Sequence, residues 1–425
     1  MRAALWLLAL FGMAAAVALF AGNNQGTVTV FWPPYRVDLS LNLVLLLLFG
    51  GFTLLYAALR TLAALLDLPV QAGRWRTQQK ERSMHVALLD ALAHLTAGRF
   101  IRARKAAEAA IAQEKTLVGS VEPLPHAVQV RALAHLLAAE SAHALQDRAA
   151  RTHHLDEALE QTAHNPSGPA QEVRDGVQLR AAAWAVQDRD APAALEWLEQ
   201  LPQGAARRTI ALRIRLRAAR LARQPQAALE TARLLAKHRA FSPLAAQSIT
   251  RGLATELING AHDESQLLRA WQSLENGERL APELAVHAAS RLQQLGGDPA
   301  QVRQWLLPAW DALLADPDAL PESLRVRLVR TLENDMDSVD GPWLARIEGA
   351  QQRNPRDPHL QYLAGMACLR RQLWGKAQQL IGNASRQLHH PELHRNAWRA
   401  LAELAEQRGE QEAAARAWRQ AAGGA

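Results

Sequence analysis

The chain has 425 residues, 49% of them apolar, which is enough for a core larger than a minimal domain needs. Its single cysteine, Cys368, excludes an intramolecular disulfide and any cysteine-rich zinc or iron–sulfur site. The net charge of +7 arises within residues 1–105, where eleven Lys and Arg accompany four Asp and Glu. A basic excess confined to that end disfavours a nucleic-acid-binding body, so we expect no nucleic-acid partner.

Two apolar segments without charge open the chain, Ala3–Ala21 and Leu39–Leu59. Each is close to the ~20 residues that a helix needs to cross a hydrocarbon core roughly 30 Å thick. Because only a helix satisfies its own backbone in lipid, we predict two transmembrane helices. A cleaved signal peptide is the alternative for the first segment, but its apolar run exceeds the usual core of about 7–15 residues.

Residues 22–38 form a short loop between the two apolar segments. Val28, Val30 and Trp32 alternate with more polar neighbours, and Pro33-Pro34 ends the run. This alternation predicts an extended piece or a hairpin at the membrane interface. Trp32 and Tyr35 are then expected at headgroup depth, where such side chains are enriched.

Basic residues follow the second apolar segment, and such residues remain on the cytoplasmic side of a bacterial inner membrane. We therefore predict a two-helix membrane hairpin over residues 1–66 with a periplasmic loop, then a basic juxtamembrane helix over 67–83. Both termini and the helical body would be cytoplasmic. The basic residues set this orientation, bind anionic lipid, or do both. They are Arg74, Arg76, Lys80, Arg82, Arg99, Arg102, Arg104 and Lys105.

Helix-forming residues and a recurring pattern of small and apolar positions dominate from residue 84 onward. Ala194 and Ala228 are 34 residues apart, and Gly365 and Ala402 are 37 apart, as in tetratricopeptide repeats. A small residue allows two helices to approach closely, and apolar residues follow it at helical spacing. We predict an all-α fold with an α-solenoid of antiparallel helix pairs, in blocks 84–240 and 241–425. The positions assigned to repeat packing are Ala103, Ala194, Ala228, Gly365, Ala377, Ile381, Ala384, Ala402, Ala414 and Trp418.

Sequence motifs for nucleotide binding, zinc proteolysis and thiol redox chemistry are absent, and nothing arranges Ser, His and Asp for nucleophilic catalysis. We therefore assign no catalytic residue and no metal ligand, and expect a scaffold rather than an enzyme. Two adjacent pairs, His153-His154 and His389-His390, could offer an imidazole to the iron of a tetrapyrrole. The alternative is that they are exposed histidines that stabilise helix C-termini.

The N-terminal third resembles a known family, the proteobacterial HemY proteins of the inner membrane, which carry tetratricopeptide repeats. The likeness is specific over about residues 1–115 and rests on repeat architecture beyond them. It implies a place in haem or porphyrin biosynthesis, haem-pathway proteins as partners, and haem or porphyrin as a ligand, but no catalytic residues. The residues that carry it are Gly26, Val28, Trp32, Tyr35, Leu68-Pro69 and Gly98-Arg99-Phe100.

Three functions stay open at this point. The first is a membrane-tethered scaffold that gathers haem-pathway enzymes or hands over a porphyrin. The second is an enzyme of late haem synthesis, and the third is an envelope-assembly scaffold unrelated to haem. Self-association into a homo-oligomer also stays open.

Overall fold

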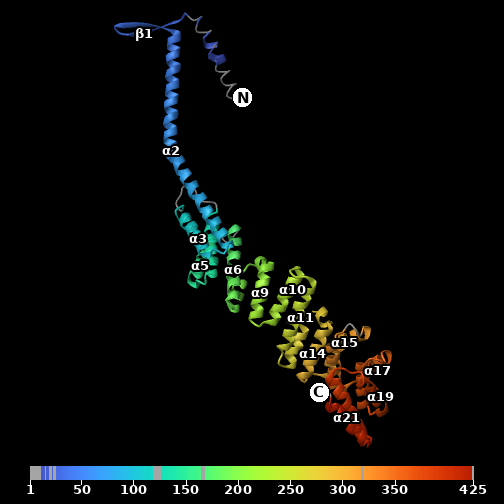
Figure 1. Cartoon of the computed structure of the whole chain (residues 1–425). Helices are drawn as coiled ribbons and strands as arrows, with labels where there is room; N and C mark the ends of the chain where they lie inside the picture. The colour runs from blue at the N-terminus through green and yellow to red at the C-terminus, as the bar shows by residue number, and fades with distance from the viewer. Residues whose placement is uncertain are drawn as a thin grey trace. The chain divides into compact units, whose positions relative to one another are not determined.

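The computed structural model describes residues 11–14, 16–18, 22, 25–117, 126–163, 168–316 and 320–423. Most of these residues are helical, which confirms the predicted helical fold, and one β-hairpin is added to it (Figure 1). The fold divides after Arg174 into two units, and each is described by itself below. The block boundary expected near residue 240 stays a prediction.

The hairpin consists of strands β1 (Thr27–Trp32) and β2 (Tyr35–Ser40), paired antiparallel around Pro33-Pro34. Residues directly opposite each other in such a pair point to the same side of the sheet. One face is therefore wholly apolar, and the other carries Thr, Ser, Asp and Arg with one Phe. The apolar face is made by the pairs Val28 with Leu39, Val30 with Val37 and Trp32 with Tyr35.

Helix α2 (Leu41–Thr96) follows the hairpin directly and runs unbroken for 56 residues. Ser40 caps it by accepting a hydrogen bond from the backbone N–H of Leu43, and the Leu41 N–H donates to the Gly26 carbonyl at 2.8 Å. These bonds fix the start of the helix to the base of the hairpin. The basic helix predicted over residues 67–83 is the middle of α2, continuous with the apolar segment before it.

One stretch of α2, Leu41–Ala63, is long and apolar enough to cross a membrane, and none of it is buried within the protein. It is the one such span among the described residues. It overlaps the second predicted span, Leu39–Leu59, but starts two residues later because Leu39 and Ser40 belong to β2, and it ends four residues later. The first predicted span, Ala3–Ala21, lies mainly outside the described residues.

The first unit packs α2 against α3 (Phe100–Lys115), α3 against α4 (Ala127–Ala144), and α4 against α5 (Arg148–Ala163). The connection between α2 and α3 is short, so these helices run antiparallel. Alanines occupy much of the interface, for example Ala91, Ala107 and Ala138, which form one buried cluster. Small side chains here allow the helix axes to approach closely. Helix α6 (Pro169–Gln187) contains the division between the units.

The second unit stacks helix pairs in chain order on one continuous apolar core that extends from Leu212 to Leu404, the arrangement of an α-solenoid. Consecutive helices that pack extensively against each other include α9 with α10, α10 with α11, α14 with α15, α18 with α19 and α20 with α21. The helices are α7 (Ala191–Glu199), α8 (Gln203–Ala206), α9 (Thr209–Leu221), α10 (Pro225–Lys237), α11 (Pro243–Asn259), α12 (Glu264–Gln272), α13 (Asn276–Arg279), α14 (Pro282–Gln294), α15 (Pro299–Ala315), α16 (Glu322–Asn334), η2 (Met336–Ser338), α17 (Gly341–Arg353), α18 (Pro358–Arg370), α19 (Trp374–Ser385), α20 (Pro391–Gln407) and α21 (Gln411–Gly423).

Proline and short polar residues set the helix starts in this unit. A proline at the first or second helical position has no N–H to leave unsatisfied and a φ already suited to a helix. An Asp or Ser before it accepts hydrogen bonds from the free backbone N–H groups. The prolines are at the starts of α7, α10, α11, α14, α15, α17, α18 and α20, and side chains cap α7, α11, α12, α15, α17 and α18.

Helices α18 and α19 approach each other closely at Gly365 of α18. A Cβ atom placed there would lie 2.5 Å from Ile381 Cγ1 and 3.1 Å from the Ile381 backbone nitrogen. Both residues are buried, so the missing side chain of Gly365 is what brings the two helices together.

Candidate functional site

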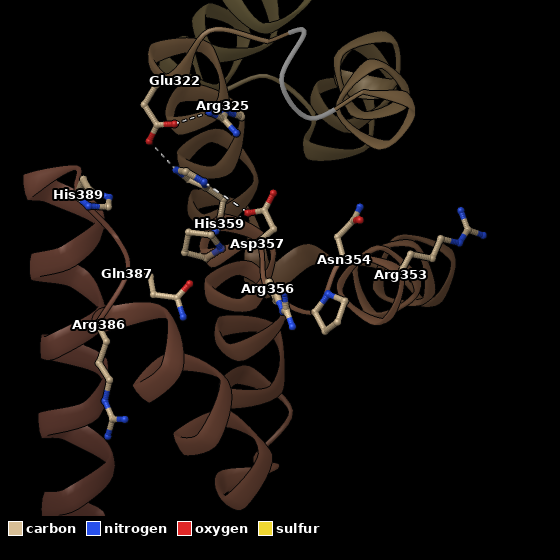
Figure 2. A pocket seen from close by; sticks show the side chains of 12 residues that line it. Glu322, Arg325, Arg353, Asn354, Arg356, Asp357, His359, Arg386, Gln387 and His389 are labelled. Carbon is tan, nitrogen blue, oxygen red and sulfur yellow. Dashed lines mark hydrogen bonds and ion pairs between the residues drawn. The ribbon is translucent and has the colours of Figure 1, made fainter.

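A charged pocket of about 1020 Å³ lies in the second unit, where the ends of several helices meet (Figure 2). The start of α16, the end of α17, the start of α18 and the end of α19 with its following loop supply its walls. We call it the arginine pocket. Its lining residues are Glu322, Arg325, Arg353, Asn354, Pro355, Arg356, Asp357, Pro358, His359, Arg386, Gln387 and His389.

His359 occupies the middle of the arginine pocket, between two carboxylates (Figure 2). Its Nε2 lies 3.0 Å from Glu322 Oε1 and its Nδ1 lies 3.5 Å from Asp357 Oδ1. The ring is buried, with only 5% of the residue exposed. Glu322 also pairs with Arg325 at 2.9 Å. The centre of the pocket therefore holds a buried imidazole with a carboxylate close to each of its ring nitrogens.

Asp357 has a structural role as the N-cap of α18. Its Oδ1 accepts hydrogen bonds from the backbone N–H of His359 at 2.8 Å and of Leu360 at 3.2 Å. Burial alone would raise the pKa of this carboxyl, but hydrogen bonds from the His359 side chain and the backbone hold it below its usual range. Asp357 therefore remains ionised and fixes both the helix start and the histidine.

Three arginines stand around this network without a carboxylate partner among the described residues: Arg353, Arg356 and Arg386. All three are exposed. Arg353 and Arg386 lie on opposite sides of the pocket, with Arg356 between them (Figure 2). Four arginines and two carboxylates line the pocket, so it has an excess of positive charge at neutral pH.

The lining offers no hydroxyl, thiol or amine as a nucleophile, and Pro355 and Pro358 are its only apolar residues. Across the described part of the chain, no group of three or more His, Cys, Asp or Glu side chains is placed to hold a metal ion. The chemistry that this arrangement supports is binding of an anionic, polar ligand.

A second groove, of about 1180 Å³, lies between α10, α11, α13 and α14. Arg233 in it pairs with Glu278 and Glu275, and the hydrogen bonds that Arg233 donates to Glu278 raise the Arg233 pKa above its ordinary value. Its cationic group is thus already satisfied, unlike the arginines above. Leu234 and Leu244 are exposed at the same groove.

The structure places His153 and His154 on α5, facing different ways. His153 is exposed, whereas His154 is buried against His135 of α4, with the two Nδ1 atoms 3.1 Å apart. Burial, and then the charge of His154, lowers the His135 pKa from 6.5 to about 4. Burial also lowers the His154 pKa. His154 is thus engaged with another imidazole and is not free to ligate a metal.

The second predicted pair lies beside the arginine pocket. His389 is exposed and lines the pocket. His390 is the N-cap residue of α20 and is half-buried. His153-His154 belong to the first unit and His389-His390 to the second.

The predicted membrane-surface residues are distributed over α2 and α3. Arg76, Lys80 and Arg82 are exposed on α2, and the side chain of Arg74 lies outside the described residues. Around the start of α3, Arg104 is half-buried and pairs with Asp147 at 3.0 Å and with Glu108 at 3.7 Å. The other three are exposed: Arg99, Arg102 and Lys105.

Nine of the ten positions assigned to repeat packing are buried. Trp418 is 37% exposed, and its indole N–H donates to Glu406 Oε1 at 2.7 Å. The buried positions are Ala103, Ala194, Ala228, Gly365, Ala377, Ile381, Ala384, Ala402 and Ala414.

Sequence reasoning missed Arg353, Arg356, Arg386 and His359 of the arginine pocket. No local motif contains all four, because Arg353, Arg356 and His359 lie within one stretch of seven residues whereas Arg386 comes 27 residues after His359. The available signal was the breaker run from Asn354 to Pro358, which places two arginines and a histidine around one inter-helix turn.

Comparisons with known proteins give a family match and matches to solved structures. Residues 26–146 match the model of a family described as "HemY protein N-terminus", a range that extends from the hairpin through α2, α3 and α4. The crystal structure of the P58(IPK) TPR domain aligns over 76% of this chain and 99% of that chain, with 14% sequence identity and a TM-score of 0.23. A comparison with curated proteins gives no match. The arginine pocket lies outside the family-matched range.

Proposed function

The chain belongs to the HemY family through residues 26–146, and from this premise we propose that it is a membrane-anchored accessory protein of haem biosynthesis. In this proposal its tetratricopeptide-like helical body binds partner proteins of the pathway. The observation that carries it is the continuity of α2, which is a bare apolar span at one end and part of the helical body at the other.

The stretch Leu41–Ala63 is suited to anchoring the chain in a membrane, because its apolar side chains do not pack against other parts of the protein. Leu46, Phe49, Phe52 and Leu54 are each between 68% and 74% exposed. Burying such a side chain contributes about 1.5–3 kcal/mol, which a lipid bilayer can supply and water cannot. Exposed Arg76, Lys80 and Arg82 follow on the same helix, as expected for the cytoplasmic flank of a span.

The finer topology belongs to the same proposal. Ala3–Ala21 would form a second span, the β-hairpin would lie at the periplasmic face, and both termini with the helical body would be cytoplasmic. Cysteine labelling tests this in a Cys368→Ala background. A membrane-impermeant maleimide applied to spheroplasts should label Thr29→Cys and leave Arg416→Cys unlabelled. The reverse pattern would place the body outside the inner membrane and end the proposal.

Accessory binding is favoured over catalysis by the composition of the arginine pocket. It contains no nucleophile, and the imidazole in it is already held between Glu322 and Asp357. Pull-down of the full chain from detergent-solubilised membranes should recover enzymes of late haem synthesis. Conversion of a porphyrin by the purified chain would instead support the enzyme alternative.

Deletion of the gene separates the haem role from a general envelope role. We expect porphyrin intermediates to accumulate and the full chain to restore normal levels. Normal porphyrin and haem after deletion, together with an envelope defect, would favour the scaffold unrelated to haem.

A direct haem or porphyrin contact is the least supported part of the proposal. The arginine pocket beside His389 offers no large apolar or aromatic wall for a macrocycle, and His154 is already bonded to His135. The residues predicted to contact a tetrapyrrole thus do not fit the ring. Titration with porphyrin and comparison of the absorbance of the parent, His389→Ala/His390→Ala and His153→Ala/His154→Ala proteins tests this. Equal spectra would leave protein partners as the only ligands.

A further inference from the structure

We propose that the arginine pocket binds an extended acidic peptide segment of a partner protein. This inference rests on the proposed accessory function and assigns it a site. It begins from charge complementarity: Arg353, Arg356 and Arg386 are exposed, have no carboxylate partner among the described residues, and surround one opening. A guanidinium offers a planar pair of donors that matches a carboxylate.

The spacing of the arginines favours a peptide over a compact anion. Arg353 and Arg386 lie on opposite sides of the opening, with Arg356 between them (Figure 2). The network of Glu322, His359 and Asp357 occupies the centre. A phosphate drawn to the middle would meet two fixed carboxylates. An extended chain instead places alternate side chains about 7 Å apart and can reach the rim arginines while its backbone crosses the centre.

Amide side chains complete the match to a peptide. Asn354 and Gln387 line the same pocket on opposite sides, and each has both a donor and an acceptor for a backbone N–H and C=O (Figure 2). Their side chains have no hydrogen-bond partner among the described residues. The lining therefore contains groups for the carboxylates and groups for the main chain, but no wall for an aromatic ring.

Contacts among Asp357, His359 and Glu322 hold the walls of the arginine pocket in position. Asp357 caps α18 and holds His359, which contacts Glu322 of α16 at 3.0 Å. The ends of α16 and α18 are thus linked beneath the opening. Arg325 is paired with Glu322 and contributes to the wall rather than to the ligand.

Fluorescence anisotropy with the full chain in detergent tests the proposal. The probe is a fluorescein-labelled, end-capped heptapeptide of alternating glutamate and glycine. We expect saturable binding that weakens as salt is added, because exposed charges are screened. The triple variant Arg353→Glu/Arg356→Glu/Arg386→Glu should lose at least about tenfold in affinity, and Asn354→Ala/Gln387→Ala should lose less.

A matched variant controls for net charge. Arg217→Glu/Arg269→Glu/Arg416→Glu reverses three exposed arginines of the same unit that do not line the pocket. It should bind the probe within about twofold of the parent, with thermal unfolding measured on all proteins. Equal losses in the two triple variants would mean non-specific attraction and overturn the proposal.

Other anions provide further discriminating outcomes. Tripolyphosphate that displaces the peptide at equal concentration would assign the pocket to phosphate instead. Loss of porphyrin binding in the pocket variant, with peptide binding unchanged, would assign the pocket to a tetrapyrrole.

Two outcomes separate the peptide-binding proposal from the proposed haem role. Absence of peptide binding, together with porphyrin accumulation in the deletion strain, would overturn the peptide-binding proposal alone. Peptide binding lost in the pocket variant, with normal porphyrin in the deletion strain, would overturn the haem role alone.

Discussion

A single missing side chain, at Gly365, sets the distance between α18 and α19. Its absent Cβ would lie 2.5 Å from Ile381 Cγ1, and the backbone nitrogen at 3.1 Å prevents a simple adjustment of the side chain. The 37-residue recurrence identified Gly365 and Ala402 as equivalent small positions, and both are buried.

We expect Gly365→Ala to destabilise the second unit by about 1–3 kcal/mol, because the helices must separate to admit one methyl group. Gly382→Ala on α19 is the matched control, since a Cβ there meets nothing within 4 Å. Removing a glycine from a helix interior should stabilise it by up to about 1 kcal/mol. Thermal unfolding of the full chain in detergent measures both. Equal effects of the two changes would contradict the packing account.

The facing imidazoles of His135 and His154 connect stability to pH in the first unit. Burial, followed by the charge of His154, lowers the folded His135 pKa from 6.5 to about 4, and burial lowers that of His154. The unfolded chain therefore binds protons first as the pH falls. The contribution of this neutral histidine pair to the free energy of unfolding is fully present above pH 6.5 and is lost as the pH falls towards 4.

His135→Leu should flatten this dependence, because a leucine fills the buried site without titrating. We expect the midpoint of thermal unfolding of the parent to fall more steeply between pH 7 and 5 than that of the variant. His389→Leu, at an exposed site, should retain the slope of the parent. Identical slopes in the parent and His135→Leu would show that the pair does not couple folding to pH.

At the scale of the element, the hairpin presents two chemically different faces. The pairs of Val28 with Leu39, Val30 with Val37 and Trp32 with Tyr35 make one face apolar. Trp32 and Tyr35 are 74% and 72% exposed. The hydrogen bond from Leu41 to Gly26 holds the hairpin against the start of the membrane span, so a lipid surface is available to this face.

Labelling of neighbouring positions on β1 should distinguish the two faces. In a Cys368→Ala background, a bimane label on Val30→Cys should be shielded from iodide in lipid nanodiscs, whereas one on Thr29→Cys should be quenched as in water. The comparison is sharp because consecutive residues of a strand point to opposite sides. Equal quenching at both positions would mean that the apolar face is not in lipid.

The sequence predicted much of the secondary structure but not the arginine pocket. Alternation in Val28, Val30 and Trp32 indicated extended structure, and the structure places these residues in strand β1. The second apolar segment and the basic helix predicted over residues 67–83 lie on one helix, because a change from apolar to basic residues does not interrupt backbone hydrogen bonding in α2. The arginine pocket required the tertiary fold, since its residues meet only when helix ends are stacked.

At the scale of the whole molecule, the proposed attachment to the membrane would depend on Leu41–Ala63, the described stretch that is long and apolar enough to cross one. We expect Leu47→Arg/Leu54→Arg to remove most of the chain from the carbonate-washed membrane fraction, because each central arginine costs about 2.5–3.5 kcal/mol of insertion. Leu234→Arg/Leu244→Arg, at exposed positions of the helical body, is the matched control and should leave the fraction unchanged. A chain that stayed with the membrane despite arginines in the span would have another principal anchor.

The length of α2 beyond its span determines the clearance between the bilayer and the first repeat. Met84 is the first buried side chain of α2 among those described, and it packs with Leu117 and Val130. It comes about 20 residues after the span ends at Ala63, which is roughly 30 Å of helix at 1.5 Å per residue. With the span perpendicular to the bilayer, this distance is comparable to the diameter of a small globular domain. In the proposed topology, membrane enzymes whose cytoplasmic parts extend to that height would meet the first helices of the body from the side, and proteins that extend no further than the headgroups would pass beneath them.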